Sequence, residues 1–283
     1  MRRLKKRLFK LSHEGNEMEN KIITILGSGN IGLSIAKGLV HAQLITPKKI
    51  ILTRRNVELL KEFSLQGFSV SSDNKKAVVQ SDIVIIAVQP QQLNDLLIQI
   101  KPSLKAKKHT VISVVSGATI SAMQKLLGAQ IKIVRAMPNT AIAIQQSMTC
   151  LSSDSPEALT YAEKIFDTLG KSLVIKEELM GPATALCACG IAFFLRAVRA
   201  ASQGGIEIGF HSEEAIMMAA QTAKGAAALL LENKNHPESE VDKVTTPRGI
   251  TISGLNQMEH NGFSSALIKG IVTSAEKAAK IYS

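Results

Sequence analysis

Short apolar runs alternate with helical patterns through the first half of the chain. Residues 21–26, 49–53, 68–71, 82–88, 110–115 and 132–136 are apolar and rich in β-branched side chains, which predicts strands. Between them, apolar residues recur at helical spacing near residues 31–40, 57–66, 93–100 and 121–127. Strands that are apolar along nearly their whole length indicate a parallel sheet covered by helices on both faces.

The pattern changes after about Pro156. Residues 156–169 are predicted to form a helix and residues 172–175 one last strand, while nearly everything from Glu177 onward has helical spacing. The expected helices cover residues 184–205, 212–231, a short stretch from 236, 251–260 and 263–282. We therefore expect an α/β chain with a parallel-sheet domain over residues 21–176, followed by an all-helical domain over residues 177–283.

A glycine-rich segment joins the first predicted strand to the first predicted helix, and it reads Gly27, Ser28, Gly29, Asn30, Ile31, Gly32. In a GxGxxG of this kind, the first glycine permits a tight turn and the second lets a pyrophosphate approach the backbone. The third lets the helix pack closely on the strand. Free N–H groups of the first helical turn then face the phosphates. The position at a first βα turn predicts a Rossmann-type dinucleotide site; a glycine turn without a ligand is the alternative.

The second predicted strand ends in Thr53, Arg54 and Arg55. An NAD-preferring site usually carries a carboxylate here for the ribose hydroxyls, whereas guanidinium groups suit a 2′-phosphate. NADPH is therefore the expected cofactor, with NADH as the alternative donor and solvated surface arginines as the non-functional interpretation. Other loops at the carboxyl ends of strands are expected to line the same crevice. They contain Val88, Gln89, Pro90, Ser116 and Gly117.

A second candidate anion site lies in the helical half, where residues 244–251 read VTTPRGIT. This hydroxyl-rich loop runs into a predicted helix, so the N–H groups of Gly249, Ile250 and Thr251 can bind a small carboxylate. The hydroxyls of Thr246 and Thr251 can add hydrogen bonds. A simple N-capping loop is the equally open alternative.

Composition narrows the function classes. The 283 residues contain 34 Lys and Arg against 23 Asp and Glu, a net charge of +11, and six of the basic residues lie within residues 1–17. Aromatic residues make up 4% and Trp is absent, which argues against the stacking platforms that bind single-stranded nucleic acid. The six histidines show no metal-ligand spacing, and no metal site is expected.

Three features bear on location. Three cysteines do not make a disulfide framework, so a reducing compartment, the cytoplasm, is expected. No run of 18 apolar residues lacks a charge, so no membrane-spanning helix and no membrane partner are expected. Residues 1–20 are expected to be a basic, disordered extension, and a membrane-surface helix is an alternative. A start site placed upstream of the natural one is the favoured explanation of the extension, because Met18 lies just before the first predicted strand.

Four segments together resemble the pyrroline-5-carboxylate reductase family over residues 21–280. They are residues 27–32, 88–90, 135–140 (RAMPNT) and 244–251. The resemblance implies NAD(P)H-dependent reduction of the small-molecule substrate 1-pyrroline-5-carboxylate to L-proline, the last step of proline biosynthesis. It implies a C-terminal dimerisation domain, and a homo-oligomer built on an interlocked dimer and often assembled into a decamer. Thr251 matches the threonine near the imine nitrogen, and Asn74 a position that touches the adenosine end of the cofactor.

The chain departs from the family pattern at three places. Gln89 stands where the family usually has lysine, Arg248 where it has glycine, and residues 188–192 read ACGIA where it has GSGPA. The loss of a charge at Gln89 leaves the choice between NADPH and NADH more open than the arginines suggest. Arg248 is large where close backbone approach is expected.

Two other function classes remain open from the sequence. One is another Rossmann imine reductase or a β-hydroxyacid dehydrogenase. The β-hydroxyacid dehydrogenases usually use a catalytic lysine on a helix of the second domain, and Lys224 is the candidate for that lysine. The other is a non-catalytic NADP-binding protein, which would not need the loop from Thr246 to Thr251. Activity on the five-membered imine compared with short hydroxyacids distinguishes them.

Overall fold

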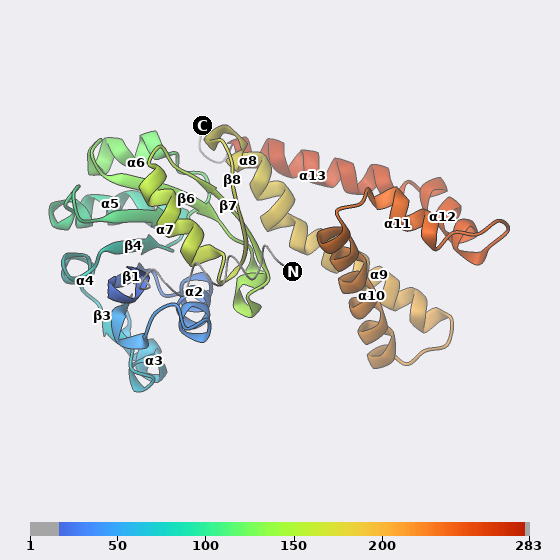
Figure 1. Ribbon diagram of the computed structural model, residues 1–283, viewed down its shortest axis with the longest axis horizontal. Helices are drawn as coiled ribbons and strands as arrows, with labels where there is room; N and C mark the ends of the chain where they lie inside the picture. Colours follow the sequence, from blue (N-terminus) through green and yellow to red (C-terminus); the bar gives the residue numbers. More distant parts are fainter. Residues whose placement is uncertain (1–16, 281–283) are drawn as a thin grey trace. The chain divides into compact units, whose positions relative to one another are not determined.

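The N-terminal half forms one eight-stranded sheet in a computed structural model that describes residues 17–280 (Figure 1). Its strand order is β3-β2-β1-β4-β5-β6-β7-β8, and all neighbours are parallel except β6 and β7. The strands are β1 Ile23–Leu26, β2 Ile50–Thr53, β3 Ser69–Ser71, β4 Ile83–Ile86, β5 Thr110–Ser113, β6 Lys132–Met137, β7 Ser147–Ser152 and β8 Gly170–Val174. The α/β class with an N-terminal Rossmann-type sheet is confirmed, and the strand order reverses at β1.

The antiparallel strand β7 was not predicted. Its sequence, SMTCLS, is not an apolar run, yet the strand is largely buried. Ser147 Oγ and Thr149 Oγ1 lie 3.1 Å apart in a hydrogen bond, and Ser147 Oγ also accepts the N–H of Asn139 at 3.1 Å. Because buried hydroxyls are tolerated when they are hydrogen-bonded, a polar strand can lie inside the sheet. The expectation of a parallel sheet is corrected for β7 and β8, which are parallel to each other and run opposite to β1–β6.

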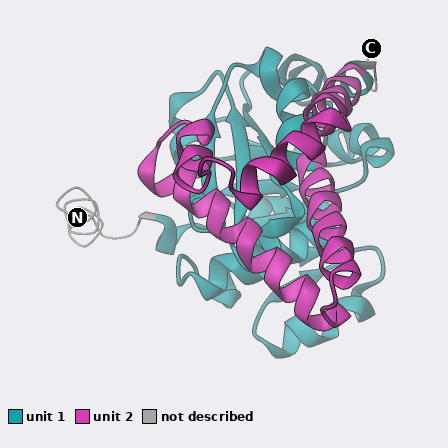
Figure 2. Ribbon diagram, turned by 90° about the vertical axis from the view of Figure 1, so that its right-hand side faces the viewer, with its two compact units in different colours: residues 1–188, 277–283 teal, residues 189–276 magenta. Residues whose placement is uncertain are grey.

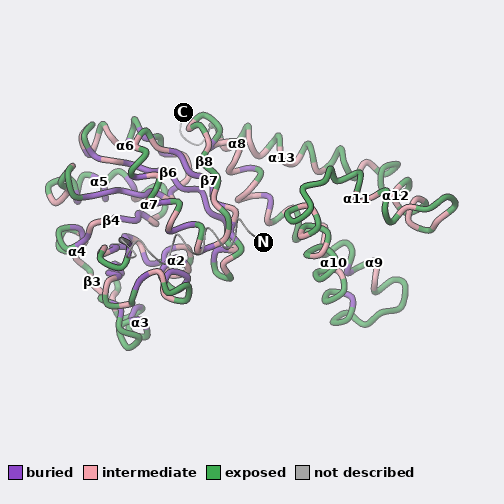
Figure 3. The backbone as a smooth tube through the Cα atoms, viewed as in Figure 1, coloured by how far each residue is buried: buried purple, intermediate pink, exposed green. Residues whose placement is uncertain are grey.

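The strands of the sheet are largely buried (Figure 3), and their alternate residues belong to two separate hydrophobic clusters. Ile23 and Ile25 pack in one cluster with Ile35 of α2, while Leu26 and Val84 pack in the other. The helices are α2 Asn30–His41, α3 Lys61–Leu65, α4 Asn74–Gln80, α5 Leu93–Ile100, α6 Ile120–Leu127 and α7 Pro156–Phe166. Of these, α4 was not predicted; Asp73 caps it by accepting the N–H of Lys76.

The expected basic extension ends earlier than residue 20. Residues 1–16 lie outside the described residues, but Glu17–Asn20 form a short 3-10 helix. Met18 is completely buried in the cluster that contains Ile23 and Ile25. Residues 17–20 are therefore ordered and not part of a disordered extension, because the apolar side chain of Met18 is buried in the core of the sheet.

The described residues divide into two compact units (Figure 2), residues 17–188 with 277–280 and residues 189–276. The first unit also contains α8 Met180–Ala183 and all but the last residue of a π-helical turn, η8, over Thr184–Cys189. The remaining helices are α9 Gly190–Glu207, α10 Ser212–Asn233, α11 Pro237–Lys243, α12 Ile250–His260 and α13 Phe263–Lys280. The compact units divide 12 residues after the boundary expected between residues 176 and 177.

The helical unit has almost no core of its own. Within residues 189–276, all of which the structure describes, only Gly190, Ser202 and Ala215 are buried. Large apolar side chains are exposed instead, among them Phe194, Leu195, Ile208, Met217, Leu231 and Ile250. So much exposed apolar surface is typical of a unit that another protein surface covers.

One helical stretch, Glu177–Glu207, is long and apolar enough to cross a membrane by length and composition, with a window of mean hydropathy 1.6 that is 17% buried. No membrane-spanning helix was expected from the sequence, because that expectation required 18 apolar residues without any charge. The stretch Glu177–Glu207 contains charged residues but still has an apolar window. A single stretch of this kind is weak evidence for a membrane span, since helices that pack on other protein surfaces have the same composition.

Candidate functional site

The turn between β1 and α2 has the geometry that a dinucleotide needs. Gly27 has φ +92°, and a Cβ there would lie 2.7 Å from the carbonyl oxygen of Ala87. A Cβ on Gly32 would lie 2.6 Å from the carbonyl oxygen of Gly27, so both positions require glycine. At Gly29 a Cβ would meet nothing within 4 Å. The backbone at Gly29 is therefore open, and no side chain caps the N-terminus of α2 within the described chain.

Hydrogen bonds join this turn to the end of β2. The Ser28 N–H donates to Thr53 O at 3.0 Å, and Arg54 Nη1 donates to Ser28 O at 3.3 Å. The Thr53 hydroxyl donates to Asn74 Oδ1 at 2.7 Å. Arg54 is half-buried and Arg55 is exposed. Four residues selected from separate parts of the sequence thus meet at the carboxyl ends of β1 and β2.

Two further loops end at the same edge of the sheet. A Cβ on Gly27 would also lie 2.7 Å from Cγ1 of Val88, so the loop after β4 touches the glycine turn. Gln89 and Pro90 are exposed at the start of a 3-10 turn. After β5, Gly117 has φ +89° and the hydroxyl of Ser116 lies 3.8 Å from the sulfur of Met137.

The candidate carboxylate loop lies in the other compact unit and forms a β-turn. The N–H of Gly249 donates to Thr246 O at 2.9 Å, and Arg248 has φ +59°. A Cβ on Gly249 would lie 2.9 Å from that same carbonyl oxygen, so only glycine fits. Because its N–H is already used, Gly249 does not offer the donor that the sequence suggested; Ile250 and Thr251 begin α12.

No side-chain hydrogen bond caps the N-terminus of α12 within the described residues. The capping alternative for Thr246 and Thr251 is therefore not what the structure shows. Ile250 is 93% exposed. An uncapped first turn leaves N–H groups free for an acidic ligand, and the positive end of the helix dipole favours one.

Sequence reasoning missed the side chains that hold these loops in place. Asn74 Nδ2 donates to Gln99 Oε1 on α5 at 3.0 Å, which fixes the amide beside Thr53. The buried Arg135 pairs with Glu177 at 3.0 Å, and the same carboxylate oxygen accepts the N–H of Ile120 at 2.7 Å. No local signal could identify pairs that are 25, 42 and 57 residues apart.

Family comparison divides the chain into two matched segments. Residues 22–117 match the family described as "NADP oxidoreductase coenzyme F420-dependent", and residues 177–281 match "Pyrroline-5-carboxylate reductase dimerisation". The first segment contains every candidate cofactor residue, and the second contains the VTTPRGIT loop. The dimerisation segment also contains the apolar stretch Glu177–Glu207, and a dimerisation domain supports a homo-oligomer.

Individual relatives decide the family. Pyrroline-5-carboxylate reductase 2 of Dictyostelium discoideum is 51% identical over 279 residues, which are 92% of this chain and 93% of that protein. The chain belongs to the pyrroline-5-carboxylate reductase family. Pyrroline-5-carboxylate reductase 1 of the same organism is 56% identical over 274 residues, and there the match covers half the length of the relative.

Solved structures of family members have the same fold. A pyrroline-5-carboxylate reductase from Coxiella burnetii aligns with a TM-score of 0.87 and 27% identity, over 93% of this chain and 99% of that one. The Plasmodium falciparum enzyme, solved with NADP bound, aligns with a TM-score of 0.85 and 26% identity, over 94% and 100%.

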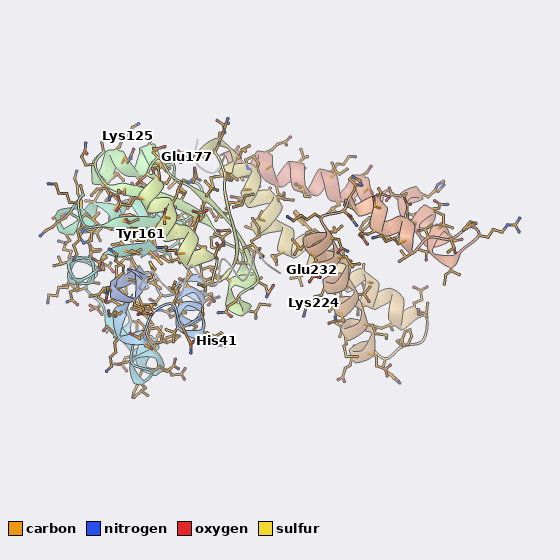
Figure 4. All side chains as sticks on the ribbon, in the orientation of Figure 1. His41, Lys125, Tyr161, Glu177, Lys224 and Glu232 are labelled. Atoms are coloured by element: carbon orange, nitrogen blue, oxygen red, sulfur yellow. The ribbon has the colours of Figure 1, made fainter. Side chains whose placement is uncertain are left out.

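The dehydrogenase alternative receives no support from Lys224. Figure 4 shows Lys224 on α10, the helix that also carries Glu232, and its side chain is exposed. Lysines are mostly exposed in folded proteins, so the position of Lys224 does not mark it as a catalytic group.

Proposed function

We propose that this member of the pyrroline-5-carboxylate reductase family reduces the C=N bond of 1-pyrroline-5-carboxylate with NADPH and forms L-proline, completing proline biosynthesis. The observation that carries the proposal is the uncapped Thr246–Thr251 turn on α12, in a chain that is 51% identical to a reductase of the family over nearly its whole length. A non-catalytic NADP-binding protein would have no use for that turn.

The glycine turn fits a dinucleotide. The backbone around Gly29 is open while Gly27 and Gly32 are closely packed, so phosphates can reach the N-terminus of α2. Arg54 and Arg55 offer positive charge at the carboxyl end of β2, where a 2′-phosphate is bound in such folds. When bound, the cofactor supplies a hydride to the imine carbon. Gln89 and Pro90, Ser116 and Gly117 are proposed to hold its nicotinamide end, with NADH as the weaker donor.

The loop before α12 is proposed to hold the substrate. The N–H groups of Ile250 and Thr251 bind the carboxylate, aided by the Thr246 hydroxyl. Gly249 keeps the turn tight enough to expose them. The Thr251 hydroxyl donates a hydrogen bond to the ring nitrogen, directly or through water, which favours hydride addition. Orientation of two bound reactants can lower a barrier by about 7–11 kcal/mol, so a strong acid is not required.

The dimerisation segment supports a homo-oligomer. We propose the finer arrangement on the resemblance to the family: an interlocked dimer, further assembled into a decamer, with each active site formed by two copies. A cytoplasmic location and the absence of nucleic-acid and membrane partners belong to the same proposal. Sedimentation of the purified protein measures the oligomer, and cell fractionation measures the location.

Replacing Thr251 by valine tests the proposed reaction. Loss of one hydrogen bond to a developing charge corresponds to about 1.5–3 kcal/mol, and turnover is expected to fall roughly 10- to 100-fold. NADPH affinity, measured by fluorescence titration, is expected to stay unchanged. Thr245→Val is the matched control, because the Thr245 hydroxyl already donates to Val241 O at 2.8 Å. Wild-type turnover in Thr251→Val rejects the role of this hydroxyl.

A further inference from the structure

Two cysteines lie side by side in the first compact unit, although 37 residues separate them. Cys150 is buried in β7, and Cys187 is half-buried in the π-helical turn η8. Their sulfur atoms are 3.9 Å apart. They belong to an apolar cluster with the buried side chains of Met137 and Met180. The third cysteine, Cys189, follows two residues later on the same helical stretch and provides an internal comparison.

The two thiols are chemically unequal. A hydrogen bond from the Cys150 thiol lowers the pKa of Cys187 to about 7. The same hydrogen bond, and then burial, raise the pKa of Cys150. Thiolates are the reactive form of cysteine. Cys187, the more accessible of the two, is therefore the nucleophile, and Cys150 is the thiol that meets it.

The geometry permits a covalent bond after a small movement. A disulfide has a sulfur–sulfur distance of about 2.05 Å, so these atoms must approach by roughly 1.9 Å. Cys187 lies in a π-helical turn, a rare conformation that is concentrated at functional sites. Because a widened turn can tighten without unfolding its neighbours, η8 is the part of this pair that can move.

The thiol pair also lies next to the proposed cofactor loops. Asn139 of the RAMPNT motif donates from Nδ2 to the carbonyl oxygen of Cys187 at 3.2 Å. The sulfur of Met137, a member of the same cluster, lies 3.8 Å from the hydroxyl oxygen of Ser116. A disulfide between the two cysteines would therefore connect η8 to β7. The neighbour of β7 in the sheet is β6, whose Met137 contacts Ser116 in the loop after β5.

We propose that Cys150 and Cys187 form a reversible disulfide that fixes η8 to β7, which makes the pair a site of oxidative modification by hydroperoxides. The Cys187 thiolate attacks a peroxide oxygen, which breaks the O–O bond, releases water after protonation and leaves a sulfenic acid on Cys187. Cys150 then attacks that sulfur, the S–O bond breaks, and a second water leaves. Two thiols and one hydrogen peroxide thus give one disulfide and two waters, and a dithiol reverses the change.

Counting thiols in the full-length protein tests this directly. Reduced protein is treated with hydrogen peroxide, quenched with catalase, denatured in N-ethylmaleimide and weighed by mass spectrometry. Wild type is expected to carry three adducts before oxidation and one afterwards, with three restored by dithiothreitol. Peptide mapping is expected to link Cys150 to Cys187. Hydrogen exchange in residues 184–189 is expected to slow on oxidation.

Two variants separate this pair from the third thiol. In Cys189→Ala, the matched control, the adduct count is expected to fall from two to zero; in Cys187→Ala it is expected to stay at two. Three adducts on oxidised wild type overturn the proposal, as does a linkage through Cys189 or unchanged exchange in η8. The wild-type count and peptide map decide the matter even where a variant folds poorly. Neither readout depends on reductase activity, so the result is separate from the proposed function.

Discussion

Removal of the Glu177 carboxylate is the sharpest test of how the first unit is held together. Glu177, labelled in Figure 4, precedes α8 and pairs with Arg135 of β6 at 3.0 Å. The same oxygen accepts the N–H of Ile120 at the start of α6. Arg135 is 7% exposed and its Nε is buried without a hydrogen-bond partner. Glu177→Ala therefore leaves a buried guanidinium with little to balance it.

The magnitude follows from burial. Removing one partner of a fully buried ion pair costs about 3–5 kcal/mol. Glu177 is 32% exposed, so water can partly replace the carboxylate, and we expect a loss of about 2–3 kcal/mol. For a unit of this size that loss lowers the melting temperature by roughly 5–10 °C. Glu177→Gln retains an acceptor oxygen and is expected to fall between wild type and alanine.

Thermal unfolding, measured at one protein concentration for all variants, is the assay. Glu178→Ala is the matched control: its carboxylate lies 3.9 Å from Lys176, both side chains are more than two-thirds exposed, and the change is expected to stay within about 0.5 kcal/mol. Equal melting temperatures for Glu177→Ala and Glu178→Ala would refute the reasoning, because they would show that the buried pair adds nothing beyond a surface pair.

Three further predictions concern the cofactor end, the α12 turn and pH. Replacing Arg54 and Arg55 together by alanine is expected to raise KM for NADPH far more than KM for NADH; equal increases in steady-state assays would remove the charge argument for NADPH. Arg248→Gly is expected to raise the melting temperature slightly. A non-glycine residue at φ +59° lowers the stability of the folded state by about 1–2 kcal/mol, and glycine removes this strain. Glycine also increases the entropy of the unfolded chain, which offsets about 0.5–1 kcal/mol of that gain. Arg248→Ala is its control and is expected to bring no gain; a lower melting temperature for glycine than for alanine contradicts the strain. The pKa of His109 is lowered from 6.5, first by burial and then by Lys108, so the unfolded chain binds the proton more readily. The stability that neutral His109 contributes is therefore expected to be fully present above pH 6.5 and to be lost as the pH falls below it. The difference in melting temperature between pH 7.5 and pH 5.5 is expected to be smaller in His109→Gln than in wild type.

The sequence alone determined the parallel strands of the sheet, the glycine turn and the resemblance to the family. Strands such as residues 83–86, apolar on both faces, can lie only in a covered parallel sheet, so their pattern predicts their place. Gly27 and Gly32 lie where a Cβ would collide with backbone, and for that reason local sequence identifies the turn. The α12 turn was equally visible, because proline and glycine impose its backbone conformation locally.

Tertiary structure decided what depends on partners distant in sequence. The strand β7 could not be found by hydropathy, because its buried residues include the hydroxyls of Ser147 and Thr149, which are tolerated only through hydrogen bonds to each other and to the N–H of Asn139. Met18 belongs to the core only because the sheet lies against it. Glu177 meets Arg135, and Cys150 meets Cys187, across 42 and 37 residues. Periodicity reports which face of an element is apolar, but contact between side chains depends on how the elements pack, and packing is a property of the whole fold.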